Sequence, residues 1–442
     1  MKNLVTHIGG LPVEQLAKSF GTPTFVYEKA VIEKRIAELR AFEVIRYAQK
    51  ACSNLAILAL MRKNGVVVDA VSAGEIHRAL KVGYLGRHAA SGMQGAPAAP
   101  GAESAPGIVF TADLFDEDAM RLIKEHNIPV NVGSPDMIVQ LGAFHPGAEV
   151  TLRINPGFGH GHSRKVNTGG SYSKHGIWHT DIEECLRLGA EAGVNIQGLH
   201  MHIGSGSDYH HLSTVCDAMV KAAKRMGPQL KVISAGGGLP IPYRKDQARI
   251  DIGAYFGLWD KARKAVEKEA GHPVSLEVEP GRYLVAESCS LLTQIRSVKT
   301  SGGNRFYLVD AGFDTLIRPA MYGAYHEISI CPADGRAVSD AFETIVAGPL
   351  CESGDVFTQE EGGVVTTRKL PEAVVGDYLI LHDAGAYGAA MSSNYNTRKL
   401  AAEVLIQEHG PDVIRERQTF EAILQFERIP GNLAWGLRHK GP

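Results

Sequence analysis

Short runs of apolar residues recur along residues 40–282 and alternate with stretches typical of helices. Each run is nearly continuous in its apolar character, which indicates strands that are buried on both faces. Eight parallel strands of this kind, each followed by a helix, are what a (β/α)8 barrel of the TIM type requires, so an α/β barrel is the fold we predict. A doubly wound open sheet is the alternative. The eight runs are Val44–Ala48, Val66–Val71, Ile108–Thr111, Pro129–Val132, Val150–Ile154, Ile196–Ile203, Val232–Ala235 and Val274–Val278.

Some segments between these runs carry signals for the ends of helices. Ser72 and Glu75 have the spacing of a capping box, and so do Thr180 and Glu183. Gly193 is placed to end the second of these helices. The signals support the alternation of strands and helices that the barrel needs.

The pattern changes after residue 282. We predict a barrel domain at residues 28–282 and an antiparallel β domain at residues 283–442, which a strand from residues 1–27 can join through Thr24–Tyr27. Turn signals separate the strand-like runs of this second domain, among them Phe306–Val309, Thr344–Val346 and Tyr378–Leu381.

Composition narrows the classes of function. The 442 residues carry a formal net charge of -2 and no basic run, which argues against a nucleic-acid partner or an anionic membrane surface. No apolar stretch is long enough for a membrane span, and the first residues are not typical of a signal peptide. The six cysteines are scattered and form no C-x-x-C pair, as expected of reduced thiols. We therefore expect a cytoplasmic protein that acts on a small molecule.

Polar and glycine residues follow several predicted barrel strands, at the end where the catalytic residues of such barrels lie. A lysine at this position can attach an aldehyde cofactor. Glycines after strands 7 and 8 let backbone N–H groups approach a phosphate. The pattern favours a site for an anchored phosphate-bearing cofactor. Its members are Lys50 after the first strand, Asp69 in the second, His202 and Ser205 after the sixth, Gly236, Gly237 and Gly238 after the seventh, and Glu279, Pro280, Gly281 and Arg282 after the eighth.

Nine stretches, in order over nearly the whole chain, resemble one enzyme family. They are Arg46–Asn54 (RYAQKACSN), Val68–Glu75 (VDAVSAGE), Arg153–His162 (RINPGFGHGH), His200–Gly206 (HMHIGSG), Ser234–Gly238 (SAGGG), Glu277–Arg282 (EVEPGR), Arg318–Tyr322 (RPAMY), Gly348–Asp355 (GPLCESGD) and Ala384–Asn394 (AGAYGAAMSSN). The chain resembles the diaminopimelate decarboxylases, which belong to the alanine-racemase-like, fold-type III enzymes that use pyridoxal 5'-phosphate. Among them it is most similar to the enteric-bacterial type. The resemblance implies decarboxylation of meso-2,6-diaminopimelate to L-lysine and CO2, the last step of lysine biosynthesis.

The resemblance also implies roles for single residues. Lys50 is the expected cofactor lysine, His202 stacks on the cofactor ring and Glu279 pairs with the pyridine nitrogen. A carboxylate there keeps that nitrogen protonated, which makes the ring an electron sink. The remaining expected cofactor contacts are Ser205, Gly236, Gly237 and Gly238 at the phosphate, together with Pro280, Gly281, Arg282 and Tyr387.

Further residues are implied as the substrate site and the proton donor. The resemblance makes Cys351 the expected donor, and an ordinary thiol, which is largely protonated at neutral pH, suits that role. Family members form homodimers in which Cys351 and Glu352 reach the barrel of the partner subunit. The expected substrate contacts are Arg282, Arg318, Tyr322, Glu352 and Tyr387.

Other functions stay open on the residues alone. An amino-acid racemase would need a second base facing Lys50, and a non-catalytic regulator on the same fold would be expected to have lost Lys50 or Cys351. Decarboxylases of ornithine, lysine or arginine would need an acidic pocket, whereas two arginines favour a second carboxylate on the substrate. No metal site is expected, since the histidine pairs lack acidic or cysteine partners at ligand spacing.

The sequence departs from the family pattern in three places. The segment Ser91–Gly107 is long and rich in Ala, Pro and Gly, which predicts a loop. His175 stands where phenylalanine is frequent, and the tail beyond about Phe420 has no counterpart.

Overall fold

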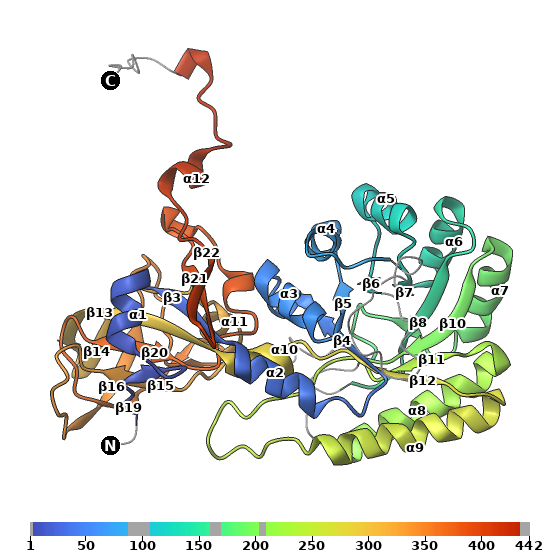
Figure 1. Ribbon diagram of the computed structural model, residues 1–442, viewed down its shortest axis with the longest axis horizontal. Coiled ribbons are helices and arrows are strands. Elements are labelled where there is room, and N and C mark those ends of the chain that lie inside the picture. The colour runs from blue at the N-terminus through green and yellow to red at the C-terminus, as the bar shows by residue number, and fades with distance from the viewer. Residues whose placement is uncertain (1–2, 87–106, 160–168, 203–208, 434–442) are drawn as a thin grey trace.

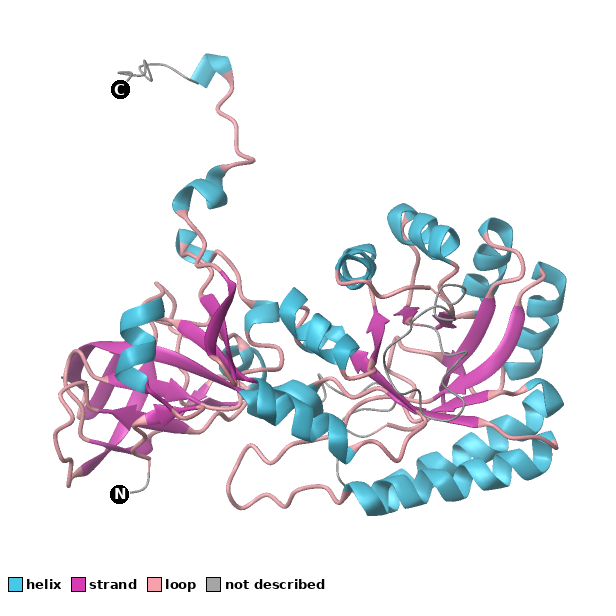
Figure 2. Ribbon diagram, viewed as in Figure 1, coloured by secondary structure: helices cyan, strands magenta, loops and turns pink. Residues whose placement is uncertain are grey.

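The computed structural model describes residues 3–86, 107–159, 169–202 and 209–433, and in it a helix-covered barrel lies beside a domain built mainly of strands (Figures 1 and 2). The predicted loop Ser91–Gly107 lies outside the described residues except for Gly107, and Ser205 also lies outside them. No helix in the described ranges is long and apolar enough to cross a membrane.

The barrel consists of eight parallel strands that pair in chain order and close upon themselves. The first strand pairs with the last, which closes the barrel. The fifth strand pairs with the sixth, so every strand has a neighbour on each side. All eight predicted runs are therefore confirmed as barrel strands. A two-residue strand, β9 (Ile177–Trp178), adds to the end of β8. The barrel strands are β4 (Val44–Ala48), β5 (Val67–Ala70), β6 (Ile108–Ala112), β7 (Val130–Val132), β8 (Glu149–Asn155), β10 (Asn195–His200), β11 (Val232–Ser234) and β12 (Ser275–Val278).

Helices surround the barrel strands (Figure 2). Between them and the strands lies a continuous core that includes Val68, Leu152 and Leu276, all fully buried. The helices are α2 (Lys29–Glu38), α3 (Leu55–Lys63), α4 (Ala73–Lys81), α5 (Glu117–His126), α6 (Pro135–Phe144), α7 (Ile182–Ala192), α8 (Tyr209–Met226) and α9 (Ile252–Ala270), and the short α10 (Arg282–Val285) leads out of the barrel.

One predicted capping box forms in part, since the Glu75 side chain accepts from Val71 N–H and not from Ser72 N–H, and the other is wrong. Ser72 Oγ accepts a hydrogen bond from the Glu75 N–H at 3.2 Å, and α4 begins directly after Ser72. At α7 the capping residue is Asp181, with no side-chain cap, because Thr180 donates to Asp181 instead and Glu183 pairs with Arg225. The helix does end at Gly193, whose φ of 68° is the left-handed value that favours glycine.

The second domain holds a mixed sheet in which most pairings are antiparallel. Its order is β19-β16-β14-β13-β3-β21-β22, with β20 between β13 and β15. The N-terminal strand β3 pairs antiparallel with β13 and parallel with β21, and β14 with β16 is the other parallel pairing. The strands are β3 (Thr24–Glu28), β13 (Cys289–Ser301), β14 (Asn304–Val309), β15 (Ile328–Cys331), β16 (Ala341–Ala347), β19 (Arg368–Pro371), β20 (Tyr378–Leu381), β21 (Ala402–Gln407) and β22 (Gly410–Arg415).

Smaller elements complete this domain. The helices α1 (Val13–Phe20) and α11 (Arg318–Tyr322) belong to it, as do two strand pairs, β1 (His7–Ile8) with β2 (Leu11–Pro12) and β17 (Gln359–Glu360) with β18 (Val364–Val365).

A loop of the barrel reaches across to the β domain. It connects β11 to α9 and extends beneath the second domain in Figure 1. Lys245 on this loop pairs with Glu327 at 2.8 Å. The ring of Tyr325 packs between the guanidinium groups of Arg244 and Arg368, at 4.1 and 3.8 Å from the ring centroid. These contacts hold the loop, and the neighbouring Tyr243, between the two domains.

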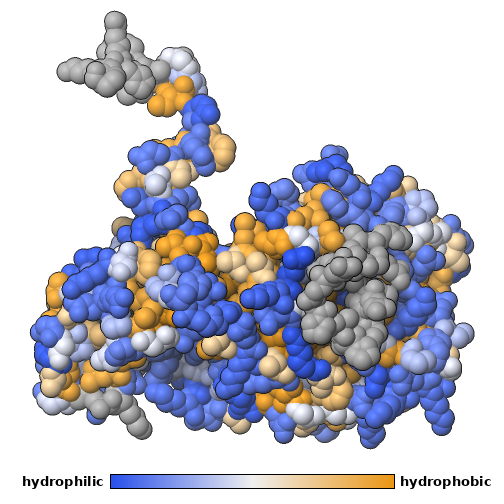
Figure 3. All heavy atoms as spheres, viewed as in Figure 1, coloured by the Kyte–Doolittle hydropathy of each residue, from blue (hydrophilic) through white to orange (hydrophobic). Residues whose placement is uncertain are grey.

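The C-terminal arm, residues 416–433, leaves the β domain and projects away from the body (Figure 1). It contains α12 (Phe420–Leu424), which Thr419 caps. Apolar side chains are exposed along the arm, and Figure 3 shows them as orange patches. They are Phe420, Leu424, Phe426, Ile429 and Leu433, with exposed fractions from 51% to 85%.

Candidate active site

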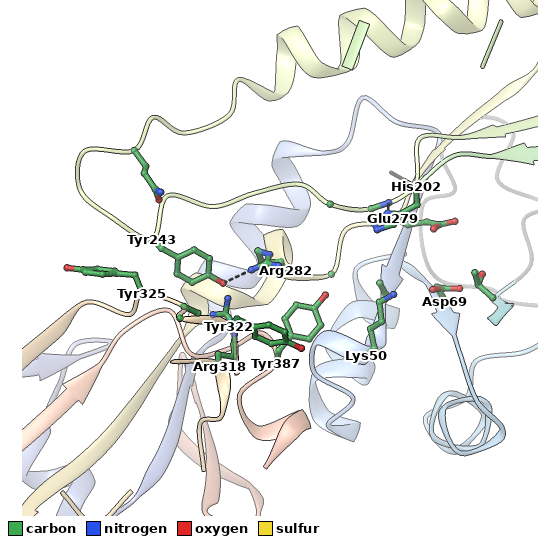
Figure 4. Close-up of a pocket in the computed structure, with 18 of the residues that line it drawn as sticks. Lys50, Asp69, His202, Tyr243, Glu279, Arg282, Arg318, Tyr322, Tyr325 and Tyr387 are labelled. Carbon is green, nitrogen blue, oxygen red and sulfur yellow. Dashed lines mark hydrogen bonds between the residues drawn. The ribbon is translucent and has the colours of Figure 1, made fainter. Parts of the chain in front are cut away.

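A cavity of about 630 Å³ lies where the carboxyl ends of the barrel strands face the β domain (Figure 4). Both domains contribute to its wall, so residues far apart in the chain meet there. Most of the predicted site residues line it: Lys50, His202, Gly237, Gly238, Glu279, Gly281, Arg282, Arg318, Tyr322 and Tyr387.

Two predicted residues lie beside the cavity and two lie away from it. The carbonyl of Gly236 accepts from Glu279 N–H at 2.8 Å, and the carbonyl of Pro280 accepts from Ala48 N–H at 3.2 Å, so both hold the strand ends together. Cys351 and Glu352 are exposed on the β domain and are not among the residues that line the cavity.

Lys50 follows β4 in a short 3-10 helix, Gln49–Ala51. Its backbone is fixed on both sides, because Ala48 N–H before it donates to the Pro280 carbonyl at 3.2 Å and the Ala51 carbonyl after it accepts from Tyr387 N–H at 2.8 Å. The ammonium group makes no hydrogen bond or ion pair to another residue of the described ranges, and it points into the cavity (Figure 4). A lysine held in this way is available to bind a carbonyl compound covalently.

The three glycines after β11 lie against β10 and the end of β12. A Cβ atom on Gly236 would come within 2.6 Å of the Met201 carbonyl oxygen, and one on Gly237 within 2.5 Å of the Glu279 carbonyl oxygen. Gly238 has a φ of 92°, which side chains disfavour. The loop can pass this close to its neighbours only with glycine, and Gly237 and Gly238, which line the cavity without side chains, leave room for a phosphate to approach the backbone.

Glu279 is buried at the end of β12. Its Oε2 atom lies 2.7 Å from His200 Nε2, and its Oε1 accepts from Ser234 Oγ at 3.1 Å. Burial alone would raise the pKa of Glu279, but His200, assisted by Arg46 and His202, outweighs it and lowers the pKa to about 2. Glu279 is therefore an anion at any working pH.

His202 presents a flat, neutral ring to the same part of the cavity. Burial, together with Arg153 and Lys50, lowers its pKa well below the ordinary histidine value. Its Nδ1 atom accepts from Gly237 N–H at 2.8 Å, and its plane lies within 10° of that of His200. A fixed neutral imidazole is suited to stacking on an aromatic cofactor. The glycine cradle, the free lysine, this ring and the anionic Glu279 together fit pyridoxal phosphate.

Sequence reasoning missed several residues of the cavity wall, among them Thr111, Arg153 and Tyr243. Thr111 lies near the end of β6 and Arg153 near the end of β8, so the rule of strand ends could have identified both. Tyr243 lies on the loop after β11 and carries no such signal. Asp69, noted at the end of β5, is buried, and burial with the nearby charge of Glu279 raises its pKa to about 6.

The end of the cavity next to the β domain is cationic. Arg282 donates to the Tyr243 hydroxyl at 3.2 Å and lies 5.5 Å from the ring centroid of Tyr387. The guanidinium of Arg318 lies 4.8 Å from the centroid of Tyr243 and is almost completely buried. Neither arginine forms an ion pair with a carboxylate of the described residues, so both charges face the cavity (Figure 4).

Among the described residues, no group of three or more His, Cys, Asp or Glu side chains is arranged to hold a metal ion.

Comparisons with known proteins agree with this site. Residues 29–286 match the model of the pyridoxal-dependent decarboxylases, pyridoxal binding domain. The chain is 54% identical over 417 residues to the diaminopimelate decarboxylase of Escherichia coli K12, covering 94% of this chain and 96% of that protein. A crystal structure of diaminopimelate decarboxylase, 52% identical, superposes with a TM-score of 0.88 over 95% of this chain and 97% of that one. The M. jannaschii enzyme in co-complex with L-lysine, 28% identical, gives 0.83 over 97% and 96%.

Proposed function

The chain belongs to the diaminopimelate decarboxylase family of pyridoxal-dependent decarboxylases, and we propose that it converts meso-2,6-diaminopimelate to L-lysine and CO2. This reaction is the last step of lysine biosynthesis. The observation that carries the choice of substrate is the cationic end of the cavity, where Arg282 and Arg318 face open space without a carboxylate partner in the described chain.

Pyridoxal phosphate, the family's cofactor, supplies an electron sink for the electron pair left behind when CO2 departs. We propose that Lys50 would hold its aldehyde carbon, and that the Gly236–Gly238 backbone and Ser205 would hold its phosphate. His202 supports the ring face. Glu279, kept ionised by His200, would hold a proton on the ring nitrogen of the bound cofactor, which would make the electron sink effective.

The substrate has an amino-acid head at each end. One head reacts near Lys50, and the carboxylate of the other needs a fixed cation at the far end of the cavity. Arg318 can meet it with paired hydrogen bonds, with Arg282, Tyr322 and Tyr387 around it. Lysine, ornithine and arginine lack this carboxylate, so their binding would leave a buried guanidinium unpaired, at a cost of roughly 1–3 kcal/mol.

We propose Cys351 as the proton donor, acting in the cavity of a partner subunit, with Glu352 as a substrate contact there. Two observations support a homodimer of this kind. Cys351 is exposed on the β domain and does not line the cavity of its own chain. The C-terminal arm displays apolar side chains that a second copy of the chain would bury.

A cytoplasmic location is also part of the proposal. It is supported by the six cysteines, all of which are unpaired although five of them are buried.

Release of CO2 from a panel of amino acids tests the function. The purified protein, loaded with pyridoxal phosphate, is expected to show the absorbance band of a lysine-bound cofactor and to decarboxylate meso-diaminopimelate far faster than L-lysine, L-ornithine or L-arginine. Comparable rates on ornithine would overturn the substrate assignment and leave the decarboxylase class intact. Racemisation without CO2 release would overturn both.

A further inference from the structure

His326 supports Arg318 from behind, on the side away from the cavity. Arg318 Nη1 lies 3.0 Å from His326 Nε2, and His326 Nδ1 lies 2.8 Å from the carbonyl oxygen of His382. His326 is 1% exposed and Arg318 4%, so water does not compete for these bonds. The Arg318 guanidinium is thus tied through one imidazole to the backbone that follows β20.

The two partners fix the protonation state of the imidazole. A carbonyl oxygen can only accept, so Nδ1 carries the hydrogen. A guanidinium can only donate, so Nε2 carries none. His326 is therefore the neutral Nδ1–H tautomer. Burial, and after it the charge of Arg318, lowers the pKa of His326 well below the ordinary value, in agreement with this assignment.

Other buried arginines of this chain have a different kind of partner. Arg46, 2% exposed, forms an ion pair with Glu277 at 2.9 Å. Arg35, also buried, pairs with Glu38 and Glu287. Arg318 is as deeply buried, yet the group behind it is uncharged. Since a carboxylate behind Arg318 would neutralise its charge, a neutral acceptor fixes the orientation and leaves the charge for a ligand.

Tyr243 completes the support from the opposite domain. Its ring lies 4.8 Å from the Arg318 guanidinium and meets the His326 ring edge to face, at 5.7 Å and 72°. Its hydroxyl accepts from Arg282. One tyrosine of the barrel loop therefore packs against the arginine and the histidine of the β domain.

We propose that His326 is a positioning residue for substrate choice: as a neutral hydrogen-bond acceptor it aims the Arg318 guanidinium into the cavity and leaves its positive charge uncompensated until a substrate carboxylate binds. This inference rests on the proposed function, in which Arg318 meets the distal carboxylate of diaminopimelate. Selectivity for a dicarboxylate then depends on the uncharged state of His326 as well as on the Arg318 guanidinium.

A matched pair of variants tests the charge. His326→Gln keeps a neutral acceptor near the position of Nε2, and His326→Glu places an anion of nearly the same size there. For the pyridoxal-phosphate-loaded enzyme we expect His326→Gln to change KM for meso-diaminopimelate by less than about 3-fold. We expect His326→Glu to raise it by about 30-fold or more with a much smaller change in kcat, because the substrate carboxylate must displace an internal one.

A third variant covers the case in which His326→Glu does not fold, as judged by circular dichroism and thermal unfolding. His326→Ala removes the acceptor, and we expect KM to rise by about 10-fold, with His326→Gln restoring most of the loss. Equal KM values for the Gln and Glu variants, or an unchanged KM in His326→Ala, would show that His326 only fills space.

The wild-type protein separates this failure from failure of the proposed function. Suppose that the wild type discriminates against L-lysine as a substrate, but the His326 variants keep the wild-type KM for meso-diaminopimelate. Only the positioning role of His326 is then overturned. If the wild type accepts L-lysine and meso-diaminopimelate equally well, the proposed substrate itself is wrong, whatever the variants do.

Discussion

His200 and Glu279 form a buried pair at the ends of β10 and β12, the strands on either side of β11, with His200 Nε2 2.7 Å from Glu279 Oε2. Because the carboxylate is ionised, the imidazole is the donor. The pair lies beside Lys50 and His202 in the cavity. His200 thus keeps the buried Glu279 carboxylate ionised, whereas burial alone would favour its neutral acid form.

Glu279→Gln is expected to lower kcat by roughly 10²–10³-fold, because an amide cannot hold a proton on the cofactor's ring nitrogen as a carboxylate does. The measurement is steady-state CO2 release, with Glu191→Gln on the exposed face of α7 as the control. Since the pKa of Glu279 is lowered to about 2, we also expect no fall in wild-type kcat from its titration at any pH above about 4. A kcat in Glu279→Gln close to that of the wild type would remove Glu279 from the mechanism.

Asp69 gives a prediction about stability in the cofactor-free protein. Burial, with Glu279 nearby, raises its pKa to about 6, so the folded state favours the protonated acid. The stabilising contribution is therefore present below the ordinary aspartate pKa and is lost as pH rises through about 6. Asp69→Asn removes this dependence. We expect the variant to gain free energy of unfolding relative to wild type between pH 4 and pH 8, by up to about 3 kcal/mol for a shift of about two units.

Urea unfolding at both pH values measures this difference, and Asp118→Asn on the exposed surface of α5 is the control. A gap between wild type and Asp69→Asn that does not change with pH would mean that Asp69 is ionised in the fold.

The barrel could be predicted because its strands are buried on both faces, which leaves nearly continuous apolar runs such as Ile108–Thr111 in the sequence. Local spacing was a weaker guide. The capping box at Thr180 failed because Glu183 pairs with Arg225, 42 residues away, and no local pattern contains that contact. Lys50 and Glu279 could be predicted as residues of one site, because the carboxyl ends of all strands of a parallel barrel lie on the same side.

Tyr243 and His326 could not be predicted in the same way. Both lie on loops, and what places them together is the packing of the barrel loop against the β domain through Tyr325 and Lys245. His175, which stands where phenylalanine is frequent in the family, has an acidic partner in the structure. Its Nδ1 lies 2.6 Å from Asp113 Oδ2.

Lys50→Ala is expected to abolish the absorbance band of the lysine-bound cofactor and to reduce turnover by at least about 10³-fold, because the covalent attachment is lost. Lys81→Ala, at the end of α4 and outside the cavity, is the matched control and is expected to keep both. Absorbance and CO2 release are recorded on the same samples. Retention of colour and activity by Lys50→Ala would exclude the cofactor assignment.

Mixing two inactive variants tests whether the site is shared between subunits. Lys50→Ala and Cys351→Ala are each expected to be poor catalysts, since Cys351 lies outside the cavity of its own chain. After subunit exchange, a heterodimer contains one cavity with both residues intact. About a quarter of the wild-type activity is then expected at random exchange. No recovery in heterodimers verified by differential tagging would show that Cys351 serves its own chain or is not the donor.

The last prediction concerns the geometry of the cationic end. Arg318→Lys keeps the positive charge, but an ammonium cannot reproduce the planar fork that binds a carboxylate through two parallel hydrogen bonds. It also cannot keep the bond to His326 Nε2 while it reaches the substrate, because its donors radiate from a single nitrogen. We therefore expect kcat/KM for meso-diaminopimelate to fall by roughly 10–100-fold, equivalent to the loss of one or two charge-assisted hydrogen bonds.

The rate on L-lysine, which lacks the distal carboxylate, is expected to be low in both proteins and nearly unchanged by the substitution. The quantity to measure is thus the ratio of kcat/KM for meso-diaminopimelate to kcat/KM for L-lysine, in the wild type and in Arg318→Lys. Arg296→Lys is the control, since the Arg296 side chain is exposed on the β domain away from the cavity. A ratio that stays constant in Arg318→Lys would mean that charge alone, without the fork and its histidine support, selects the substrate. A ratio that falls only in Arg318→Lys ties selectivity to the direction in which the guanidinium is held.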